Sequence, residues 1–319
     1  MPATSDARGV TSARAAPRRR LPGAIWRHRV FYLMLLPGVL WFVVYKYFPM
    51  YGVIIAFKEY NLVDGVFASG WADPWYKYFK QFVESPYFGQ LLANTFLISF
   101  YKLLFGMAPP IVFALLISEC RYSRYARFIQ TLSYMPHFLS WVVIFGILTA
   151  FLSQSSGLVN RYIGEFGGDP VPFLTSTDWF RSILVGSDIW KDIGWGSIIY
   201  LAAIAGIDPT LYEAGRVDGA SRLRMIWHIT LPGIRNVIVL LMILQLGHFL
   251  DAGFEQIYVM YNVQVYPVAD IIDTWVYRVG LQDLNFSLGS AVGLFKSAIG
   301  LVLVLGSNAL ARRWGGGIW

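Results

Sequence analysis

The chain has 319 residues, of which 56% are hydrophobic and 14% charged, and a formal net charge of +7 at pH 7. This composition excludes an ordinary soluble enzyme, because so apolar a chain needs lipid around most of its surface. The positive charge does not indicate nucleic-acid binding, since the excess of arginine falls in loops expected to face the cytoplasm. We therefore expect an all-α integral membrane protein.

Six apolar stretches are long enough to cross a bilayer, which requires about 20 helical residues. The first is interrupted by Lys46 and Pro49, and the fifth is short and begins near Pro232. The sequence therefore predicts a multi-pass protein with about six transmembrane helices. Their approximate spans are 30–57, 91–118, 133–152, 183–207, 237–250 and 288–310.

The orientation is predicted from arginine and lysine, which are retained on the cytoplasmic side of short loops. Alternate connections are basic, and the loops between them (58–87, 153–182 and 251–287) contain mixed charge with Trp and Tyr. Both termini are therefore expected in the cytoplasm. The basic segments are the tail 1–28, the loop with Arg121, Arg124 and Arg127, the loop with Arg216, Arg222 and Arg224, and the end with Arg312 and Arg313.

The loop at 208–232, between the fourth and fifth spans, carries the most specific pattern. Asp208 can cap a helix whose first residue is Pro209. Along that helix Leu211, Ala214 and Val217 would share an apolar side, and Glu213 could pair with Arg216. On these features alone, a surface amphipathic turn is the simpler interpretation.

The full spacing of this loop resembles the cytoplasmic signature of the membrane subunits of bacterial ATP-binding-cassette (ABC) importers. In that signature Glu-Ala-Ala is followed by Gly and then by Ile-x-Leu-Pro. The resemblance implies a type I ABC importer transmembrane domain and a coupling helix that docks on a separate ATPase. Gly215 replaces the usual second Ala, a change that could loosen the helix by up to about 1 kcal/mol. The implied docking residues are Glu213, Ala214, Gly215, Asp218, Gly219, Leu231 and Pro232.

Flanking sequences extend the resemblance to oligosaccharide-importer permeases, over roughly residues 30–313. Within that group the chain is similar to the first permease subunit of alginate importers. The resemblance implies a saccharide substrate, with alginate as the specific candidate, moved by alternating access across the bacterial inner membrane. It implies a second permease subunit, an ATPase dimer and an extracytoplasmic solute-binding protein as partners. The expected domains are a disordered basic tail (1–28), the permease domain (29–313) and a cytoplasmic tail (314–319).

A saccharide pathway needs aromatic faces and hydrogen-bonding groups, which are costly in lipid unless they are used. Lys191 is either the counter-ion for uronate carboxylates or the ion-pair partner of Asp188 or Asp192. For Trp190 and Trp195, helix packing or anchoring at the lipid interface is the simpler interpretation. The pathway candidates are Tyr134, Trp190, Lys191, Trp195, Gln245, His248, Asp251 and Glu255.

The sequence has no pattern for catalysis of its own. It contains no Gly-x-x-x-x-Gly-Lys-Ser/Thr phosphate loop, no Gly-x-Ser-x-Gly elbow, and no metal-ligand spacing among its four histidines. We expect no catalytic residue, metal or cofactor in this chain, with ATP and Mg on the partner ATPase. An ion-coupled secondary transporter is the alternative, but repeated interrupted helices are not visible. A membrane-bound enzyme would need a metal site or a carboxylate-rich acceptor loop, and neither is apparent.

Overall fold

The computed structural model describes residues 28–313, with side chains described as far as residue 309. Residues 1–27 of the predicted tail 1–28, the predicted tail 314–319, and the side chains of Arg312 and Arg313 lie outside this part. The described residues form two units, 28–53 and 54–313. The predicted division into tail and permease domain stays a prediction.

The first unit is helical and apolar. It contains α2 (Arg29–Phe42), a π-helical turn (Val43–Tyr47) and α3 (Phe48–Met50). The 3₁₀ turn that follows, Tyr51–Phe57, continues into the second unit, and together these elements form a helical stretch of 29 residues, which is long enough to cross a bilayer. Its apolar side chains are exposed on the isolated chain. Such a helix requires lipid or another subunit around it.

The second unit consists of helices joined by turns and loops, and its described residues include an isolated β-bridge between Lys58 and Trp71. Its longer helices are α6 (Phe88–Ser118), α7 (Ser123–Tyr134), α8 (Trp141–Leu152), α10 (Thr177–Ala205), α13 (Leu231–Gly247) and α17 (Phe286–Arg313). Its shorter helices are α4 (Gly65–Ala68), α5 (Lys77–Val83), α9 (Leu158–Glu165), α11 (Pro209–Val217), α12 (Arg222–Met225), α14 (Phe254–Met260), α15 (Tyr266–Ala269) and α16 (Ile272–Val276). Single 3₁₀ or π turns occupy Tyr51–Phe57, Met135–Phe138, Ile226–Thr230, Phe249–Asp251, Val263–Val265 and Tyr277–Gln282.

Four helices of the described chain are long and apolar enough to cross a membrane, or up to six if each of two bent pairs is one span. The predicted third span was wrong as a single helix, because Ser123–Phe138 and Trp141–Leu152 meet at a bend of 105°. Leu139 is extended at the bend, and the Ser140 hydroxyl accepts a hydrogen bond from the Val143 amide to start α8. The cap therefore fixes a new helix direction.

The predicted start of the fifth span was also wrong, because one continuous helix runs over Arg222–Gly247. It begins at Ser221, whose hydroxyl accepts a hydrogen bond from the Arg224 amide. A π-helical turn precedes Pro232, whose ring cannot donate a backbone hydrogen bond. The first two turns of this helix are polar, so hydropathy alone could not predict where the helix begins.

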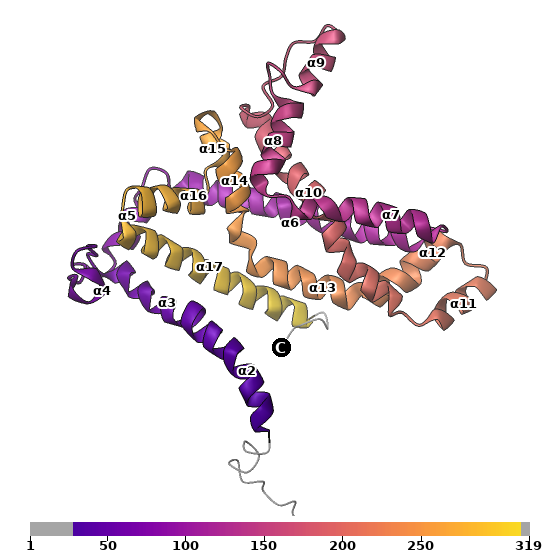
Figure 1. The fold of residues 1–319 in the computed structure, drawn as a ribbon, viewed down its shortest axis with the longest axis horizontal. Coiled ribbons are helices and arrows are strands. Elements are labelled where there is room, and N and C mark those ends of the chain that lie inside the picture. Colours follow the sequence, from indigo (N-terminus) through magenta and orange to yellow (C-terminus); the bar gives the residue numbers. More distant parts are fainter. Residues whose placement is uncertain (1–27, 314–319) are drawn as a thin grey trace, which may run out of the picture. The chain divides into compact units, whose positions relative to one another are not determined.

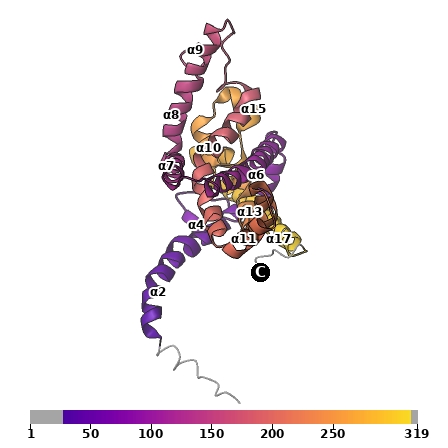
Figure 2. The ribbon, with the colours of Figure 1, turned by 90° about the vertical axis from the view of Figure 1, so that its right-hand side faces the viewer.

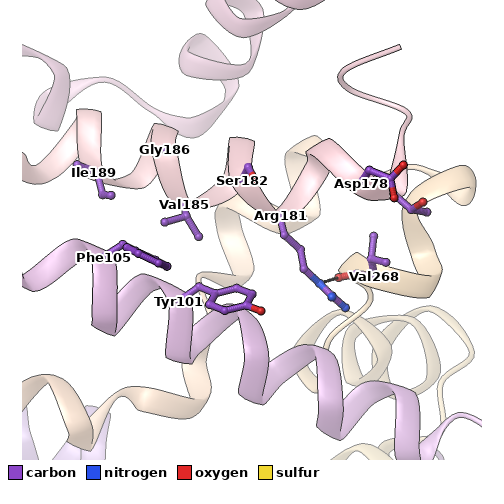
Figure 3. A pocket seen from close by; sticks show the side chains of 10 residues that line it. Tyr101, Phe105, Asp178, Arg181, Ser182, Val185, Gly186, Ile189 and Val268 are labelled. Carbon is purple, nitrogen blue, oxygen red and sulfur yellow. Dashed lines mark hydrogen bonds between the residues drawn. The ribbon is translucent and has the colours of Figure 1, made fainter. Parts of the chain in front are cut away.

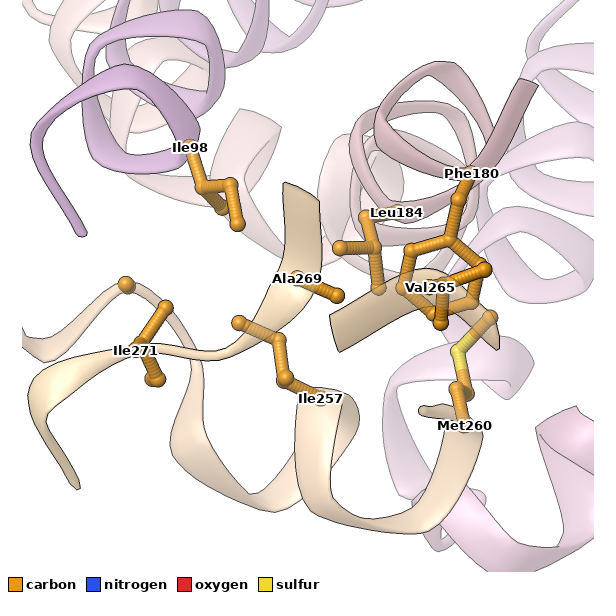
Figure 4. Packing of buried hydrophobic residues seen from close by; sticks show 9 residues of the cluster. Ile98, Phe180, Leu184, Ile257, Met260, Val265, Ala269 and Ile271 are labelled. Atoms are coloured by element: carbon orange, nitrogen blue, oxygen red, sulfur yellow. The ribbon is translucent and has the colours of Figure 1, made fainter. Parts of the chain in front are cut away.

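Helices α6 and α10 lie side by side, and Figure 3 shows Tyr101 and Phe105 on α6 facing Val185 on α10. A buried cluster covers one part of this pair, as Figure 4 shows. The segment between α13 and α17 supplies six of its nine residues, so this segment is packed against α6 and α10. The cluster consists of Ile98, Phe180, Leu184, Ala252, Ile257, Met260, Val265, Ala269 and Ile271.

The two ends of the second unit differ. At one end Arg222 lies 3.9 Å from Glu119, so the loop after α6 adjoins the loop before α13. At the other end α5 packs on α17, with Phe82 against Leu288. Helices α8 and α9 project from the rest of this unit in both views (Figures 1 and 2). Two of the basic loops therefore share one end of the unit.

Candidate functional site

Helix α11 is capped at its start by the residue that the sequence suggested. The Asp208 carboxylate accepts a hydrogen bond from the Thr210 amide at 2.9 Å, and Pro209 is the first helical residue. This backbone hydrogen bond holds the pKa of Asp208 below its usual value, because it stabilises the charged carboxylate. The cap ends the preceding connection and starts α11 at a fixed residue.

The other end of α11 is closed by glycine. Gly219 has φ +73°, a conformation that costs other residues energy. The Ala220 amide donates to the Gly215 carbonyl at 2.8 Å, and the Gly219 amide donates to the Arg216 carbonyl at 3.1 Å. This pair of bonds is the Schellman motif, which satisfies carbonyls that the helix end would leave free. Both ends of the nine-residue helix are therefore closed by its own loop.

The two faces of α11 have different surroundings. Leu211 and Val217 are 52% and 87% exposed, and Ala214 between them is also exposed. On the other face, a Cβ built on Gly215 would lie 3.3 Å from Ile229 and 3.5 Å from Met225. Gly215 therefore belongs to the inward contact, whereas the predicted apolar side faces outward with no partner in the described chain.

A partly buried hydrogen bond ties α11 to the next long helix. The Tyr212 hydroxyl lies 3.0 Å from the hydroxyl of Thr230, which is buried. Within the described residues Glu213 and Arg216 form no ion pair; Glu213, Asp218 and Gly219 are exposed. Of the remaining implied docking residues, Leu231 packs with Ile234 in a buried cluster, and the exposed Pro232 follows it in α13.

A polar cluster lies between α6, α10 and α14. Lys102 donates to Asp188 at 3.0 Å and to Gln256, whose amide nitrogen donates to Ser187 at 2.9 Å. Gly253 lies so close that any Cβ at this position would collide with the Lys102 ammonium group. The cluster therefore depends on a glycine as well as on its charged members.

Three of the predicted pathway residues line one cavity beside this cluster. Gln245, His248 and Asp251 border a space of about 180 Å³ that also reaches Lys102 and Asp188. A second space of about 280 Å³ shares Asp188 and Gln245 and continues along α10 past Asp192. The structure therefore brings Gln245, His248 and Asp251 together on a polar track between helices.

Asp251 also joins this track to the last long helix. Lys296 on α17 donates to Asp251 at 2.7 Å and to Asp273 at 2.8 Å. His248 lies 3.1 Å from the second carboxylate oxygen of Asp251. Desolvation raises the pKa of Asp273, although Lys296 opposes this shift. Lys296 was not among the predicted residues, although an ionisable residue inside an apolar helix is itself a signal.

Lys191 has a role that neither sequence interpretation anticipated. Its ammonium group donates to the carbonyls of His137 and Leu139 at 2.7 and 2.6 Å, so neither Asp188 nor Asp192 is its partner. These carbonyls lie at the bend between α7 and α8, where the extended backbone leaves them free of helical bonds. Lys191 therefore fastens this bend to α10.

The remaining predicted residues lie away from the Gln245 cavity. Trp195 stacks on His137 with ring centroids 4.5 Å apart, and Tyr134 ends α7. Trp190 is 44% exposed, and Glu255 is exposed in the first turn of α14. Their roles in transport stay predictions. In the described part of the chain, no group of three His, Cys, Asp or Glu residues is arranged to hold a metal ion.

Lys102 and Gln256 were also missed, and Asp188 was considered only as a partner of Lys191. Lys102 is a charged residue near the middle of an apolar helix, which is costly in lipid and could have flagged it from the sequence. Its partnership with Gln256, 154 positions further along the chain, has no local sequence signal. The pairing follows from packing of distant segments.

Comparison with known proteins assigns the family. Residues 106–316 match the family described as "Binding-protein-dependent transport system inner membrane component". Protein LplB of Bacillus subtilis (strain 168) is 45% identical, with 91% of each chain covered. The polygalacturonan/rhamnogalacturonan transport system permease protein YteP of the same organism is 44% identical, with 93% of this chain and 92% of YteP covered.

A solved structure has the same fold. It is a bacterial alginate ABC transporter in complex with an alginate pentasaccharide-bound periplasmic protein. One of its chains is 41% identical with a TM-score of 0.85, and the match covers 93% of this chain and 99% of that chain. The predicted type I ABC permease fold and inner-membrane location are thereby confirmed. The chain belongs to the inner-membrane components of binding-protein-dependent transport systems, as an ABC permease subunit.

Proposed function

We propose that this chain is one permease subunit of a carbohydrate ABC importer, with acidic polysaccharide fragments such as alginate as its substrate. The geometry of α11 supports this proposal most directly. A short, doubly capped helix presents Leu211, Ala214 and Val217 outward, while Gly215 and Tyr212 hold its other face to α12 and the π-helical turn that leads into α13. Such a helix can dock on a partner and pass a displacement to the helix behind it.

The proposed assembly contains a second permease subunit, an ATPase dimer that binds ATP and Mg, and an extracytoplasmic solute-binding protein. Membership of a binding-protein-dependent family supports the last partner. ATP binding would favour one conformation of the paired permeases through α11, because an effector shifts an equilibrium only by its differential affinity for the two states. The permease pair would then alternate between inward-facing and outward-facing states, with its termini in the cytoplasm.

The substrate class is supported by the relatives' names and by the polar track. YteP is a polygalacturonan/rhamnogalacturonan permease, and the solved neighbour is an alginate transporter. Gln245, Asp188 and Lys102 supply hydrogen-bonding groups between helices where lipid would otherwise exclude them. A hydrated saccharide needs such groups along its route.

The docking role is tested with Val217→Asp, which places a charge on the outward face of α11. Val217 has 87% of its surface exposed, so the variant should fold, yet a desolvated charge would oppose docking. We expect native mass spectrometry of the chain purified from its own membrane to find a second permease and two ATPase copies for the wild type. The variant should lose the ATPase copies.

Val63→Asp is the matched control, because Val63 is 90% exposed but lies in the loop before α4. It should retain the ATPase copies. Equal ATPase recovery from both variants would remove α11 from the docking surface. A wild-type chain recovered alone, transporting in vesicles without ATP, would replace the importer by a secondary transporter.

A further inference from the structure

A third cavity, of about 800 Å³, opens beside the contact between α6 and α10 (Figure 3). This volume lies within the range of small-molecule sites, about 300–1,000 Å³. Its walls are aromatic and aliphatic toward the middle of the helices and polar toward the start of α10. The lining residues include Tyr101, Thr177, Asp178, Arg181, Ser182 and Val268.

Arg181 is the cation of this cavity, and its described partners are neutral. Its Nε donates to the Val268 carbonyl at 3.1 Å, and one terminal nitrogen donates to the Asn94 side-chain oxygen at 2.7 Å. Asp178 lines the same cavity, but no ion pair with Arg181 forms among the described residues. The guanidinium is thus held in place by neutral groups, with its charge uncompensated by a carboxylate.

Three other cations of this unit are paired with carboxylates, whereas Lys58 and Lys191, like Arg181, are held by neutral groups. Lys102 meets Asp188, Arg278 meets Asp270, and Lys296 meets Asp251 and Asp273, so those charges are neutralised within the chain. A partly buried guanidinium without a carboxylate is costly, and an anionic ligand would relieve that cost. Two of its five donor hydrogens are used by Asn94 and Val268, which leaves three for a ligand.

The rest of the cavity fits a sugar ring better than a plain anion. Tyr101 offers an aromatic face and a hydroxyl, and Thr177 and Ser182 offer further hydroxyls. Asp178 can accept hydrogen bonds from sugar hydroxyls. The start of α10 adds the positive end of a 29-residue helix to the charge of Arg181.

We infer that this cavity is a subsite for a carboxylated sugar, in which Arg181 binds the carboxylate and Tyr101 faces the ring. The inference rests on the proposed carbohydrate function and adds the residue that distinguishes acidic from neutral sugars. Asn94 and the Val268 carbonyl position the guanidinium. The charges of the Lys102 cluster are already paired within the chain, so this cluster would not bind the substrate carboxylate itself.

The experiment compares Arg181→Gln with Arg181→Lys in the complete importer, reconstituted in proteoliposomes with its binding protein and internal ATP. The probe is an oligouronate. We expect Arg181→Gln to lower the rate of uptake at least tenfold. Arg181→Lys keeps the charge but not the planar fork, so it should lose less uptake than Arg181→Gln without reaching the wild-type rate. ATPase stimulation by loaded binding protein should persist in both variants.

Arg161→Gln is the control, because Arg161 is exposed on α9 and pairs only with Glu165 at 3.7 Å among the described residues. Equal losses in both Arg181 variants, or a larger loss in Arg181→Lys, would make Arg181 a structural tie between helices and overturn the inference. A phospholipid that copurifies with the wild type and is lost from Arg181→Gln would also overturn it, since the cavity would then hold lipid phosphate. A wild-type importer without ATP-dependent oligouronate uptake would instead refute the proposed function itself.

Discussion

Gly253 shows how one small residue sustains the polar cluster between α6, α10 and α14. Its φ of +84° disfavours any side chain, and a Cβ would collide with the Lys102 ammonium group. We expect Gly253→Ala to destabilise the protein by more than about 1 kcal/mol, because the backbone strain is joined by displacement of Lys102 from Asp188 and Gln256. The melting temperature of the purified complex measures this effect.

Gly65→Ala separates the two causes. Gly65 has φ +68°, but a Cβ there meets nothing within 4 Å. It therefore carries the strain without the collision, and its melting temperature should fall less than that of Gly253→Ala. Equal shifts in the two variants would mean that Lys102 moves aside at no cost, and that the cluster tolerates rearrangement.

Single residues were the hardest part to predict from the sequence. Gln245, His248 and Asp251 could be nominated because polar side chains are rare near apolar spans, and they do line one cavity. Lys191 was nominated by the same rule, yet it fastens the bend at Leu139. Residue type and hydropathy locate polar groups, whereas their partners depend on contacts between distant segments.

At the scale of elements, the effect of glycine at position 215, where the signature usually has alanine, can be tested in α11. We expect Gly215→Ala to stabilise α11 by up to about 1 kcal/mol, because alanine favours helix over glycine. The atoms that the new methyl group would approach are the end of Ile229, at 3.3 Å, and Met225, at 3.5 Å. Both side chains are flexible enough to yield. Hydrogen exchange of the α11 amides should therefore slow.

Gly164→Ala is the comparison for α9, since a Cβ at Gly164 meets nothing within 4 Å and the residue lies near the end of a similarly short helix. It reports the gain in helix propensity without any contact. If α9 exchange slows while α11 exchange accelerates, Ile229 and Met225 resist the methyl group. The glycine would then be required for the contact of α11 with α12 and the π-helical turn that follows it.

Elements were predictable where a long apolar run stood alone, as in α6 and α17. Elements were not predictable where a capping residue changed the direction of the chain, as Ser140 does. Nor were they predictable where a helix began with polar turns, as after Ser221. The capping of α11 by Asp208 and its closure at Gly219 followed from local chemistry that the sequence displays. Capping rules therefore predicted the loop at 208–232 better than hydropathy predicted the start of the fifth span.

At the scale of the whole second unit, charge is distributed unevenly between the ends. The ion pair between Glu119 and Arg222 brings two arginine-containing loops to the end that carries α11. The opposite end, around α5 and α16, mixes acidic and basic residues, including the pair Lys77–Glu59 at 2.5 Å. Because arginine-rich loops remain in the cytoplasm, α11 is expected to face the compartment that contains ATP.

The lone cysteine makes this orientation measurable. Cys120 adjoins Glu119 at the α11 end, whereas Ser155 lies in the loop after α8, which is expected outside. In intact spheroplasts, a membrane-impermeant maleimide should leave Cys120 of the native chain unlabelled until the membrane is permeabilised. In a Cys120→Ser, Ser155→Cys variant it should label the chain at once. Labelling of Cys120 from outside would place α11 in a compartment without ATP, and coupling through that helix would then be impossible however well its surface fitted an ATPase.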